Sequence, residues 1–451
     1  MKRAKALIAV GLLIVGFQAM ALAETDTIHV KDTAKPIVQV EGFGYIMFGQ
    51  LVAGDYYPDG PLNNGGHAVS HYGQNNGFAH IGVISNPTPW FTAKTALEMS
   101  TFLTLQYGSM DKSSYYEVYN ADIPSAEGIF HWNNLGSTVS SFLLESGLFQ
   151  YTNNAETKDL GNYLYRTQAY PAYIETQLDY PVANLEGARA QVGLFHDKLK
   201  IEALANCDYI YLPWHDWNFG FTATYKPSDV LSLMYGICFD HALDMNGNAQ
   251  AFPDSLDKLY KATKEDATLI FDPKPLVGGL DKICGSEDFK IYGEAAVLGQ
   301  KSYQYYPNDL SIPRPYYWNG LPLQNMPMMA GFNVPSFSKL LSGYTWDVLS
   351  VEVEWWKYPY PNDWLGYAAT NGTFNAEPMD YQGDMSTYGY PNQVKWSIYL
   401  DKSIQKFELK LMAMNDHDIY KTFSPQDQNC SEQFMRTHGD WQWYVELRYN
   451  L

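Results

Sequence analysis

Glu352 and Glu354 are the first residues whose types and spacing could do chemistry. Two positions apart, they would share one face of a β-strand, and two carboxyl groups at about 5 to 10 Å perform acid and base catalysis in glycosidases. Cationic residues on neighbouring strand faces are equally available to these carboxylates, so we interpret the pair as members of ion pairs. The chain contains no nucleophile elbow, zinc-helix motif, phosphate loop or dinucleotide fingerprint. We therefore predict that the protein is not an enzyme.

Two segments have spacings that resemble metal sites. His67 and His71 stand four apart, but the Gly and Asn residues around them argue against a helix that would bring them together. Asp244–Asn248 resembles the start of a calcium loop, yet Ala249 occupies the sixth position and Ser255 the twelfth, where such loops require Gly and Glu. We interpret both segments as loops, and we predict no metal and no cofactor.

Strict alternation of apolar and polar residues predicts the elements that would position the charged side chains. In Trp441–Leu451, Trp, Val, Leu and Tyr occupy every second position, and Gln, Glu, Arg and Asn occupy most of the others. A period of two indicates a strand with one apolar face, and eleven residues match a membrane-spanning strand. The same period recurs at 91–103, 188–194, 217–225, 289–295, 349–355 and 406–413.

The polar faces of these strands carry charges of both signs, as a water-filled lumen requires. With the polar faces assigned to the lumen, nine basic and seven acidic residues give a wall charge of about +2. The candidate pore-lining residues are Lys94, Glu98, Arg189, Lys200, Glu202, Lys290, Glu294, Glu352, Glu354, Lys406, Glu408, Lys410, Glu446 and Arg448.

The connections between the strands are strongly unequal in length. Tight turns are expected at 85–89, 226–229 and 401–403, whereas long polar and aromatic loops are expected at 54–76, 151–171, 302–328, 358–392 and 416–438. Short turns on one rim and long loops on the other are typical of an outer-membrane barrel, although a soluble β-sandwich would also alternate. We predict an all-β fold: a single antiparallel transmembrane barrel of about 16 strands, with 18 as the alternative, short periplasmic turns and long extracellular loops.

One long loop contains candidate constriction residues. The segment 151–171 combines charges of both signs with tyrosines, and such charges tune selectivity where a pore is narrow. A surface lid is the alternative role for this loop. The constriction candidates are Glu156, Lys158, Asp159 and Arg166.

The N-terminus predicts the compartment. Lys2, Arg3 and Lys5 precede an apolar run that ends near Phe17, and the small-residue pattern Ala21-Leu-Ala23 follows. This order predicts a signal peptide at 1–23, because about 12 apolar residues are too few to span a bilayer. We assign 24–36 to an N-terminal periplasmic segment and 37–451 to the barrel. Removal of three positive charges changes the formal charge from −19 to −22.

Composition and cysteine usage narrow the function classes. The net charge of −19 argues against a nucleic-acid binder, which needs a basic face for phosphates. Four cysteines, Cys207, Cys238, Cys284 and Cys430, do not form a disulfide scaffold. Alternation places Cys207 and Cys238 on opposite faces of their strands, so we do not expect them to pair.

The signal peptide, the alternating strands and the aromatic terminal strand together resemble Gram-negative outer-membrane β-barrels, porin-like in size. The assembly signal of that class usually ends on an aromatic residue, whereas this chain ends on Leu451. Segments 147–171 and 329–362 also resemble parts of uncharacterised outer-membrane proteins of Fibrobacter-type bacteria. The resemblance implies a barrel in the cell outer membrane and implies no substrate.

Two functions remain open at this point. The first is a porin-like channel for passive diffusion of small hydrophilic solutes, with weak cation preference arising at an acidic mouth. The second is a barrel-anchored surface protein whose aromatic loops, such as 303–318, bind polysaccharide or a partner. Expected partners are outer-membrane lipid, the barrel-assembly machinery through the C-terminal strand, and small solutes. No nucleic acid is expected, and a homo-oligomer is left open.

Overall fold

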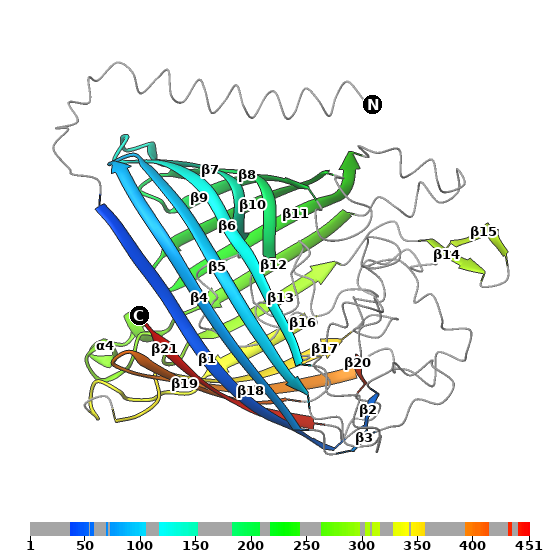
Figure 1. Cartoon of the computed structure of the whole chain (residues 1–451). Coiled ribbons are helices and arrows are strands. Elements are labelled where there is room, and N and C mark those ends of the chain that lie inside the picture. Colours follow the sequence, from blue (N-terminus) through cyan, green and yellow to red (C-terminus); the bar gives the residue numbers. More distant parts are fainter. Residues whose placement is uncertain are drawn as a thin grey trace.

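A computed structural model gives the structure of residues 37–53, 55–57, 69–70, 73–104, 117–151, 183–207, 217–243, 263–297, 303–306, 309–315, 328–341, 344–356, 393–414, 432–434 and 441–451. Sixteen strands form one closed antiparallel sheet (Figure 1). The strands are β1 (Ile37–Ala53), β4 (Gly73–Thr88), β5 (Phe91–Thr104), β6 (Glu117–Asn133), β7 (Val139–Tyr151), β8 (Ala183–Leu194), β9 (Leu199–Cys207), β10 (Trp217–Ser228), β11 (Leu231–Leu243), β12 (Thr263–Phe271), β13 (Ile291–Val297), β16 (Met328–Asn333), β17 (Val348–Trp356), β18 (Gln393–Ile404), β19 (Phe407–Met414) and β21 (Trp441–Asn450). The predicted all-β barrel of 16 strands is confirmed.

The barrel closes between its first and last strands. Each of the other strands pairs with its neighbours in chain order, and β1 pairs with both β4 and β21. In the closing pair Phe43 lies opposite Asn450, and the amide N–H of Leu451 donates to the carbonyl of Gly42 at 2.8 Å. Closure leaves no sheet edge with unpaired backbone groups.

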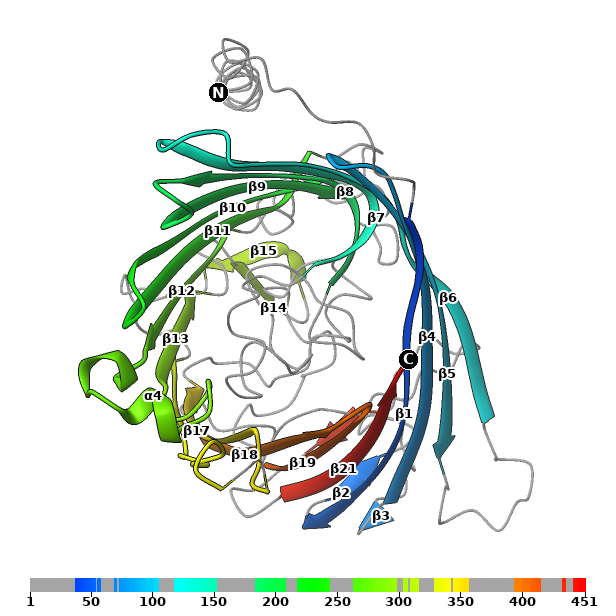
Figure 2. The same cartoon turned by 90° about the vertical axis from the view of Figure 1, so that its left-hand side faces the viewer.

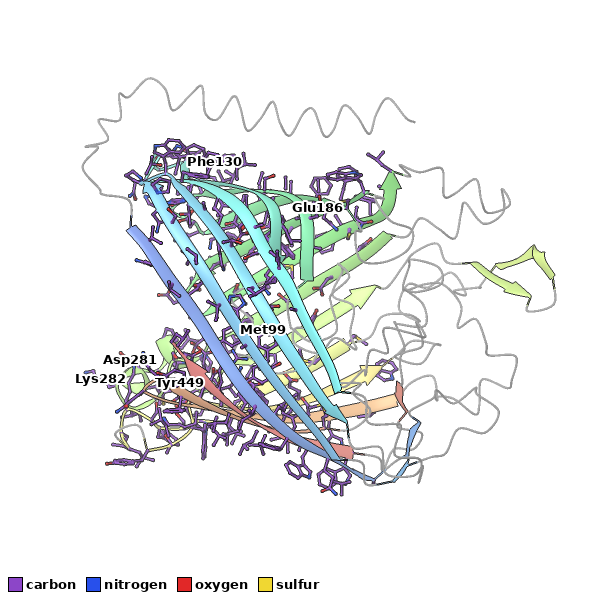
Figure 3. The ribbon with its side chains drawn as sticks, viewed as in Figure 1. Met99, Phe130, Glu186, Asp281, Lys282 and Tyr449 are labelled. Atoms are coloured by element: carbon purple, nitrogen blue, oxygen red, sulfur yellow. The ribbon has the colours of Figure 1, made fainter. Side chains whose placement is uncertain are left out.

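The period of two divides the wall into an inner and an outer face. Side chains that point into the barrel, which we call the lumen face, are mostly buried and include most of the charged residues of the strands. The outer face carries exposed apolar side chains, among them Ile81, Met99, Leu233 and Val353. Figure 3 shows Met99 on this face. The alternating sequence pattern therefore places apolar side chains on the outer face of the barrel and polar side chains on the lumen face.

The two rims of the barrel differ. The terminal rim carries the start of β1, the end of β21 and seven connections, at 89–90, 134–138, 195–198, 229–230, 272–290, 334–347 and 405–406. Near it on the outer face, Phe130 stacks at 5.9 Å on Trp90 and at 6.3 Å on Trp132 (ring centroids; Figure 3). Phe91 and Phe142 extend this cluster, which has the composition of an aromatic girdle. The opposite rim is the loop rim.

Five of the terminal-rim connections are short, and the other two form a small folded unit. The rim lobe consists of the described residues of two segments, 272–290 and 334–341 with 344–347, and it contains the 3-10 helix η2 (Lys274–Leu276) and the helix α4 (Leu280–Ile283). Viewed along the barrel in Figure 2, α4 lies outside the ring of strands. The sequence pattern did not predict this unit.

Parts of the expected long loops contain further strands. β2 (Asp55–Tyr57), β3 (Val69–Ser70) and β20 (Glu432–Phe434) form one small sheet, and β14 (Tyr303–Tyr306) pairs with β15 (Asp309–Pro315). Figure 1 shows β14 and β15 beyond the loop rim. In the part of the chain that the structure describes, no helix is long and apolar enough to span a bilayer.

The structure corrects the positions of several elements. The turns expected at 85–89, 226–229 and 401–403 lie at 89–90, 229–230 and 405–406, because each preceding strand continues further than its alternation indicates. The strand expected at 289–295 begins only at Ile291, since Phe289 has φ +63° and cannot be extended. β4 begins at Gly73, inside the loop expected at 54–76.

Candidate functional site

Strand register places most of the candidate pore-lining residues on one continuous surface. Lumen-face residues lie opposite one another on paired strands from β4 to β5, from β8 to β9, from β13 to β17 and from β18 to β21. The candidates on this surface are Lys94, Glu98, Arg189, Lys200, Glu202, Glu294, Glu352, Glu408, Lys410, Glu446 and Arg448; the side chain of Glu354 lies outside the described part of the structure.

Two candidates lie elsewhere and correct the sequence interpretation. Lys290 belongs to the rim lobe, where its ammonium lies 2.7 Å from the Glu287 carboxylate. Lys406 lies in the turn between β18 and β19, and its ammonium is 5.8 Å from the ring centroid of Tyr449 on the outer face. In the sequence, both residues continue the alternating pattern of the strand that follows them. In the structure, that strand begins only after each of them.

The first group of charges lies on β7, β8 and β9. The Arg189 guanidinium is 2.8 Å from the Glu145 carboxylate and 3.8 Å from that of Glu202. The Tyr151 hydroxyl donates to Glu202 at 2.6 Å, and the Gln191 amide donates to it at 3.1 Å. These contacts hold Arg189 between two carboxylates on the lumen wall, and one of the two also accepts hydrogen bonds from neutral side chains.

A second group lies on β19 and β21. The Arg448 guanidinium is 2.9 Å from the Glu446 carboxylate and 3.7 Å from that of Glu408, and the Lys410 ammonium lies 3.4 Å from Glu408. Arg448 also lies over the Phe43 ring at 4.5 Å, which ties the group to β1. Alternating charges of this kind hold both cations in place on the lumen face.

Other lumen carboxylates are held by neutral donors or by histidine. Glu352 accepts hydrogen bonds from the hydroxyls of Tyr292 at 2.7 Å and Ser397 at 2.8 Å. Glu98 lies 2.8 Å from the Nδ1 atom of His80 and accepts from the Gln150 amide at 2.9 Å. Because donors from two other strands converge on each carboxylate, these acids are positioned by the sheet register.

Register also reveals acidic residues on the lumen face that the sequence pattern missed. Among the residues whose side chains the structure describes, the register places eleven acids and five bases on the lumen face, a formal excess of six negative charges. The expected wall charge of about +2 is therefore wrong. The acids are Glu41, Glu98, Glu127, Glu145, Glu202, Asp266, Glu294, Glu352, Asp401, Glu408 and Glu446; the bases are Lys94, Arg189, Lys200, Lys410 and Arg448.

Two apolar clusters interrupt the charged surface. One joins Phe149, Tyr151, Leu185, Leu204 and Cys238, and Phe149 is 0% exposed. The other combines methionines and tyrosines from β1, β18, β19 and β21 with Val348 of β17. Cys238 is on the lumen face and Cys207 on the outer face, so the two are not bonded to each other, as their alternation predicts.

Several sequence predictions fall outside the described residues. These are the constriction candidates Glu156, Lys158, Asp159 and Arg166, the histidines at 67 and 71, and the acidic segment at 244–255. The aromatic loop is described only as the pairing of β14 with β15. Within the described ranges, no group of three metal-ligating side chains occurs.

Comparisons with known proteins place this barrel among solved structures. No family model and no curated protein sequence matches the chain. The structure of Salmonella typhi OmpF in complex with daunomycin aligns with 93% of this chain and 100% of its own, at TM-score 0.51 and 10% identity. The chain has a porin-like fold. A mutant of the Rh. blastica porin aligns with 92% of the chain at TM-score 0.43 and 9% identity.

The porin-like fold agrees with the family-level part of the sequence resemblance. The finer resemblance to proteins of Fibrobacter-type bacteria has no support in these comparisons. At 10% identity the likeness describes the barrel and carries no residue roles from that porin to this chain.

Proposed function

We propose that the protein is an outer-membrane channel for passive diffusion of small hydrophilic solutes. The observation that carries this proposal is the closed 16-strand sheet with ionisable residues on its lumen face and exposed apolar residues on its outer face. Apolar side chains face lipid in transmembrane barrels, and polar side chains face the water inside. The terminal rim then faces the periplasm, after removal of a signal peptide at 1–23, and 24–36 lies on the periplasmic side.

The acidic excess of the wall defines the solutes that the channel favours. A lumen with more carboxylates than cations concentrates positive ions and repels anions. Cation preference therefore arises along the wall as well as at the mouth. The loop residues Glu156, Lys158, Asp159 and Arg166 remain our candidates for a constriction, and deleting part of this loop should raise conductance.

Single-channel recording of the refolded full-length protein in a planar bilayer tests the channel. Steady open-channel steps that scale with salt concentration are the expected result. A sealed barrel that inserts in the bilayer without conductance would overturn the channel function while leaving the membrane location intact. Insertion is followed separately by heat-modifiable migration on a gel.

Burial of the lumen face favours one alternative. Ser350 and Ser397 point into the barrel and are fully buried, which fits a filled lumen better than a wide pore. A filled barrel would serve as an anchor for loops that bind polysaccharide or a partner. The absence of conductance together with binding of the protein to polysaccharide would support this second function.

The last strand is our candidate for the contact with the barrel-assembly machinery. β21 alternates over its whole length and pairs with β1 at the closing seam. Deleting residues 449–451 should leave the protein in the periplasm, and normal outer-membrane levels of this truncation would contradict the role. Substitution of the exposed turn residue Asp229 by Ala is the control and should not alter assembly.

A further inference from the structure

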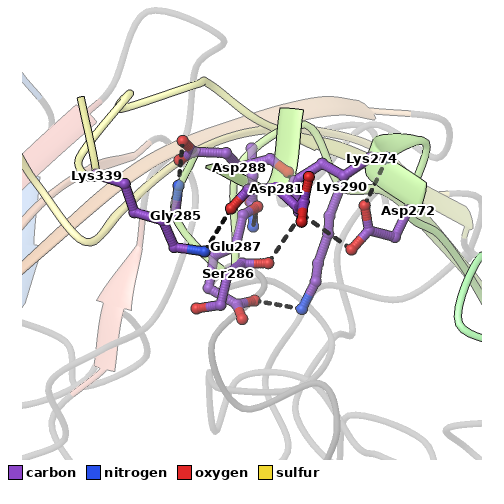
Figure 4. A network of polar contacts seen from close by, with 10 residues as sticks. Asp272, Lys274, Asp281, Gly285, Ser286, Glu287, Asp288, Lys290 and Lys339 are labelled. Carbon is purple, nitrogen blue, oxygen red and sulfur yellow. Dashed lines mark hydrogen bonds and ion pairs between the residues drawn. The ribbon is translucent and has the colours of Figure 1, made fainter. Parts of the chain in front are cut away.

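The rim lobe is held rigid by one buried carboxylate. Asp288 accepts hydrogen bonds from the amides of Gly285 at 2.8 Å, Ser336 at 2.9 Å and Phe337 at 3.1 Å, and from the Ser336 hydroxyl at 3.0 Å. The Lys274 ammonium donates to the carbonyls of residues 286 and 288, as Figure 4 shows in part. The two segments of the lobe therefore form one unit.

This rigid unit exposes large apolar side chains. Tyr344 is 93% exposed, Leu276 is 64% exposed and Leu340 is 63% exposed, and Val277 and Leu341 are also exposed. Small water-soluble connections rarely present so many large apolar groups close together. Because the lobe has its own hydrogen-bonded frame, these side chains cannot easily fold inward.

The lobe continues the outer apolar face of the barrel. Ile291, Phe332 and Val351 lie opposite one another across β13, β16 and β17, at the ends of the strands next to the lobe, and all three are exposed. In Figure 2 α4 projects outward from the ring and does not cross the opening. Val277 and Leu340 are hydrogen-bonded through their backbones to the two ends of α4, at 3.3 and 3.2 Å, and so lie beside the outer face with it.

Two exposed cations accompany these apolar groups. Lys282 lies in α4, and the Lys339 ammonium donates to the Asp281 carbonyl at 2.6 Å, joining the two segments (Figure 4). Apolar side chains flanked by lysine and tyrosine suit the boundary between lipid headgroups and acyl chains, where cations attract anionic phosphates.

We propose that the rim lobe is an interfacial anchor that inserts its exposed leucines, Val277 and Tyr344 into the adjacent membrane leaflet, with Lys282 and Lys339 at anionic phospholipid headgroups. The inference rests on the proposed membrane location of the barrel. It gives the lobe the role of fixing the depth of one side of the barrel in the bilayer.

Site-directed fluorescence in vesicles tests this anchor. Leu340→Cys is made in a Cys430→Ser chain, labelled with an environment-sensitive fluorophore and refolded into phosphatidylcholine vesicles containing phosphatidylglycerol. The native Cys207, Cys238 and Cys284 are buried and should not react. Lipids brominated near the headgroup should quench the Leu340 label strongly, and iodide in the water should quench it weakly.

Two controls separate failure of the anchor from failure of the proposed function. A label at Val353→Cys on the outer face should be quenched by brominated lipid, and a label at Ser137→Cys in the turn between β6 and β7 should be quenched mainly by iodide. No lipid quenching at Val353 would overturn the membrane location. Lipid quenching at Val353 with iodide quenching at Leu340 would overturn the anchor alone.

A third result would identify a protein neighbour instead. Protection of the Leu340 label from both quenchers would indicate that a second copy of the chain covers the lobe, and this would overturn the lipid assignment.

The contact between Lys282 and the headgroups is tested separately. Lys282→Gln should reduce the dependence of Leu340 quenching on phosphatidylglycerol, and an unchanged dependence would overturn the role of Lys282.

Discussion

At the scale of single residues, Gly147 is a position where the wall tolerates no side chain. It has φ +128° within β7, and an added Cβ would lie 2.3 Å from the carbonyl oxygen of Ala126. Gly147→Ala should therefore lower the free energy of unfolding by about 1 to 3 kcal/mol, the usual cost of a strained backbone, or by more if the clash persists. Denaturant titration of the refolded barrel measures the change. Gly278→Ala, at a lobe position with open space, should be neutral, and equal losses for both would contradict this account.

The two faces of the wall should respond differently to a new charge. Val353→Arg places a cation on the exposed apolar face and should cost about 2 to 4 kcal/mol if the position lies near the bilayer midplane. Thr268→Arg is the matched lumen change, because Thr268 lies opposite Glu294 in the adjacent row of the sheet. Glu408 would be a poor control, since an arginine there would meet Lys410 and Arg448. Unfolding in lipid vesicles that gave equal costs on both faces would contradict the barrel orientation.

At the scale of elements, sequence alternation predicted the barrel better than it predicted the wall chemistry. The strand Trp441–Asn450 and the faces of Glu352 and Arg448 follow directly from a period of two. Glu127 was missed because β6 contains a proline and a register shift that break the alternation near it. The rim lobe was missed because its structure depends on hydrogen bonds between segments about 50 residues apart, which no local period reports.

The rim lobe should depend on Asp288 more than on any apolar contact. Asp288→Ala would leave three buried or half-buried amide donors without their acceptor, and each such loss costs about 1 to 3 kcal/mol. We expect the lobe to open while the barrel stays folded. Cys284 reports on this opening, since burial raises the pKa of its thiol and the nearby Asp288 raises it further. Alkylation at neutral pH should be slow in the native chain and much faster in the variant.

The sign of the Cys284 shift sets the pH at which the lobe weakens. The pKa of the Cys284 thiol is higher in the folded state than its ordinary value of 9.0. The thiol therefore leaves the stability of the lobe unchanged below pH 9 and lowers that stability as the pH rises above 9. The Cys284 alkylation rate should therefore rise above pH 9 by more than the thiolate fraction alone explains. Asp229→Ala, in an exposed turn on the same rim, is the control. Unchanged alkylation in Asp288→Ala would show that this carboxylate does not hold the lobe closed.

At the scale of the whole molecule, the acidic wall predicts cation preference that salt reduces without abolishing. Surface charges are screened over about 10 Å at 0.1 M salt, but charges that line a narrow lumen lie within that distance of a passing ion. Reversal potentials across a salt gradient should show this preference, and Asp266→Asn combined with Glu294→Gln should weaken it. Asp229→Asn, outside the lumen, should not change it. Anion selectivity of the native channel would contradict the face assignment.

The closing seam has a consequence for how the barrel forms. All other neighbouring strands of the sheet follow one another along the chain, whereas β1 meets β21 across a separation of about 400 residues. Contacts between distant parts of a chain form late, because their loop-closure entropy is largest. The seam should be the last ladder to form and the slowest step of folding. Until it forms, the curved sheet presents two open edges, and the molecule is most vulnerable to aggregation and to proteases in that interval.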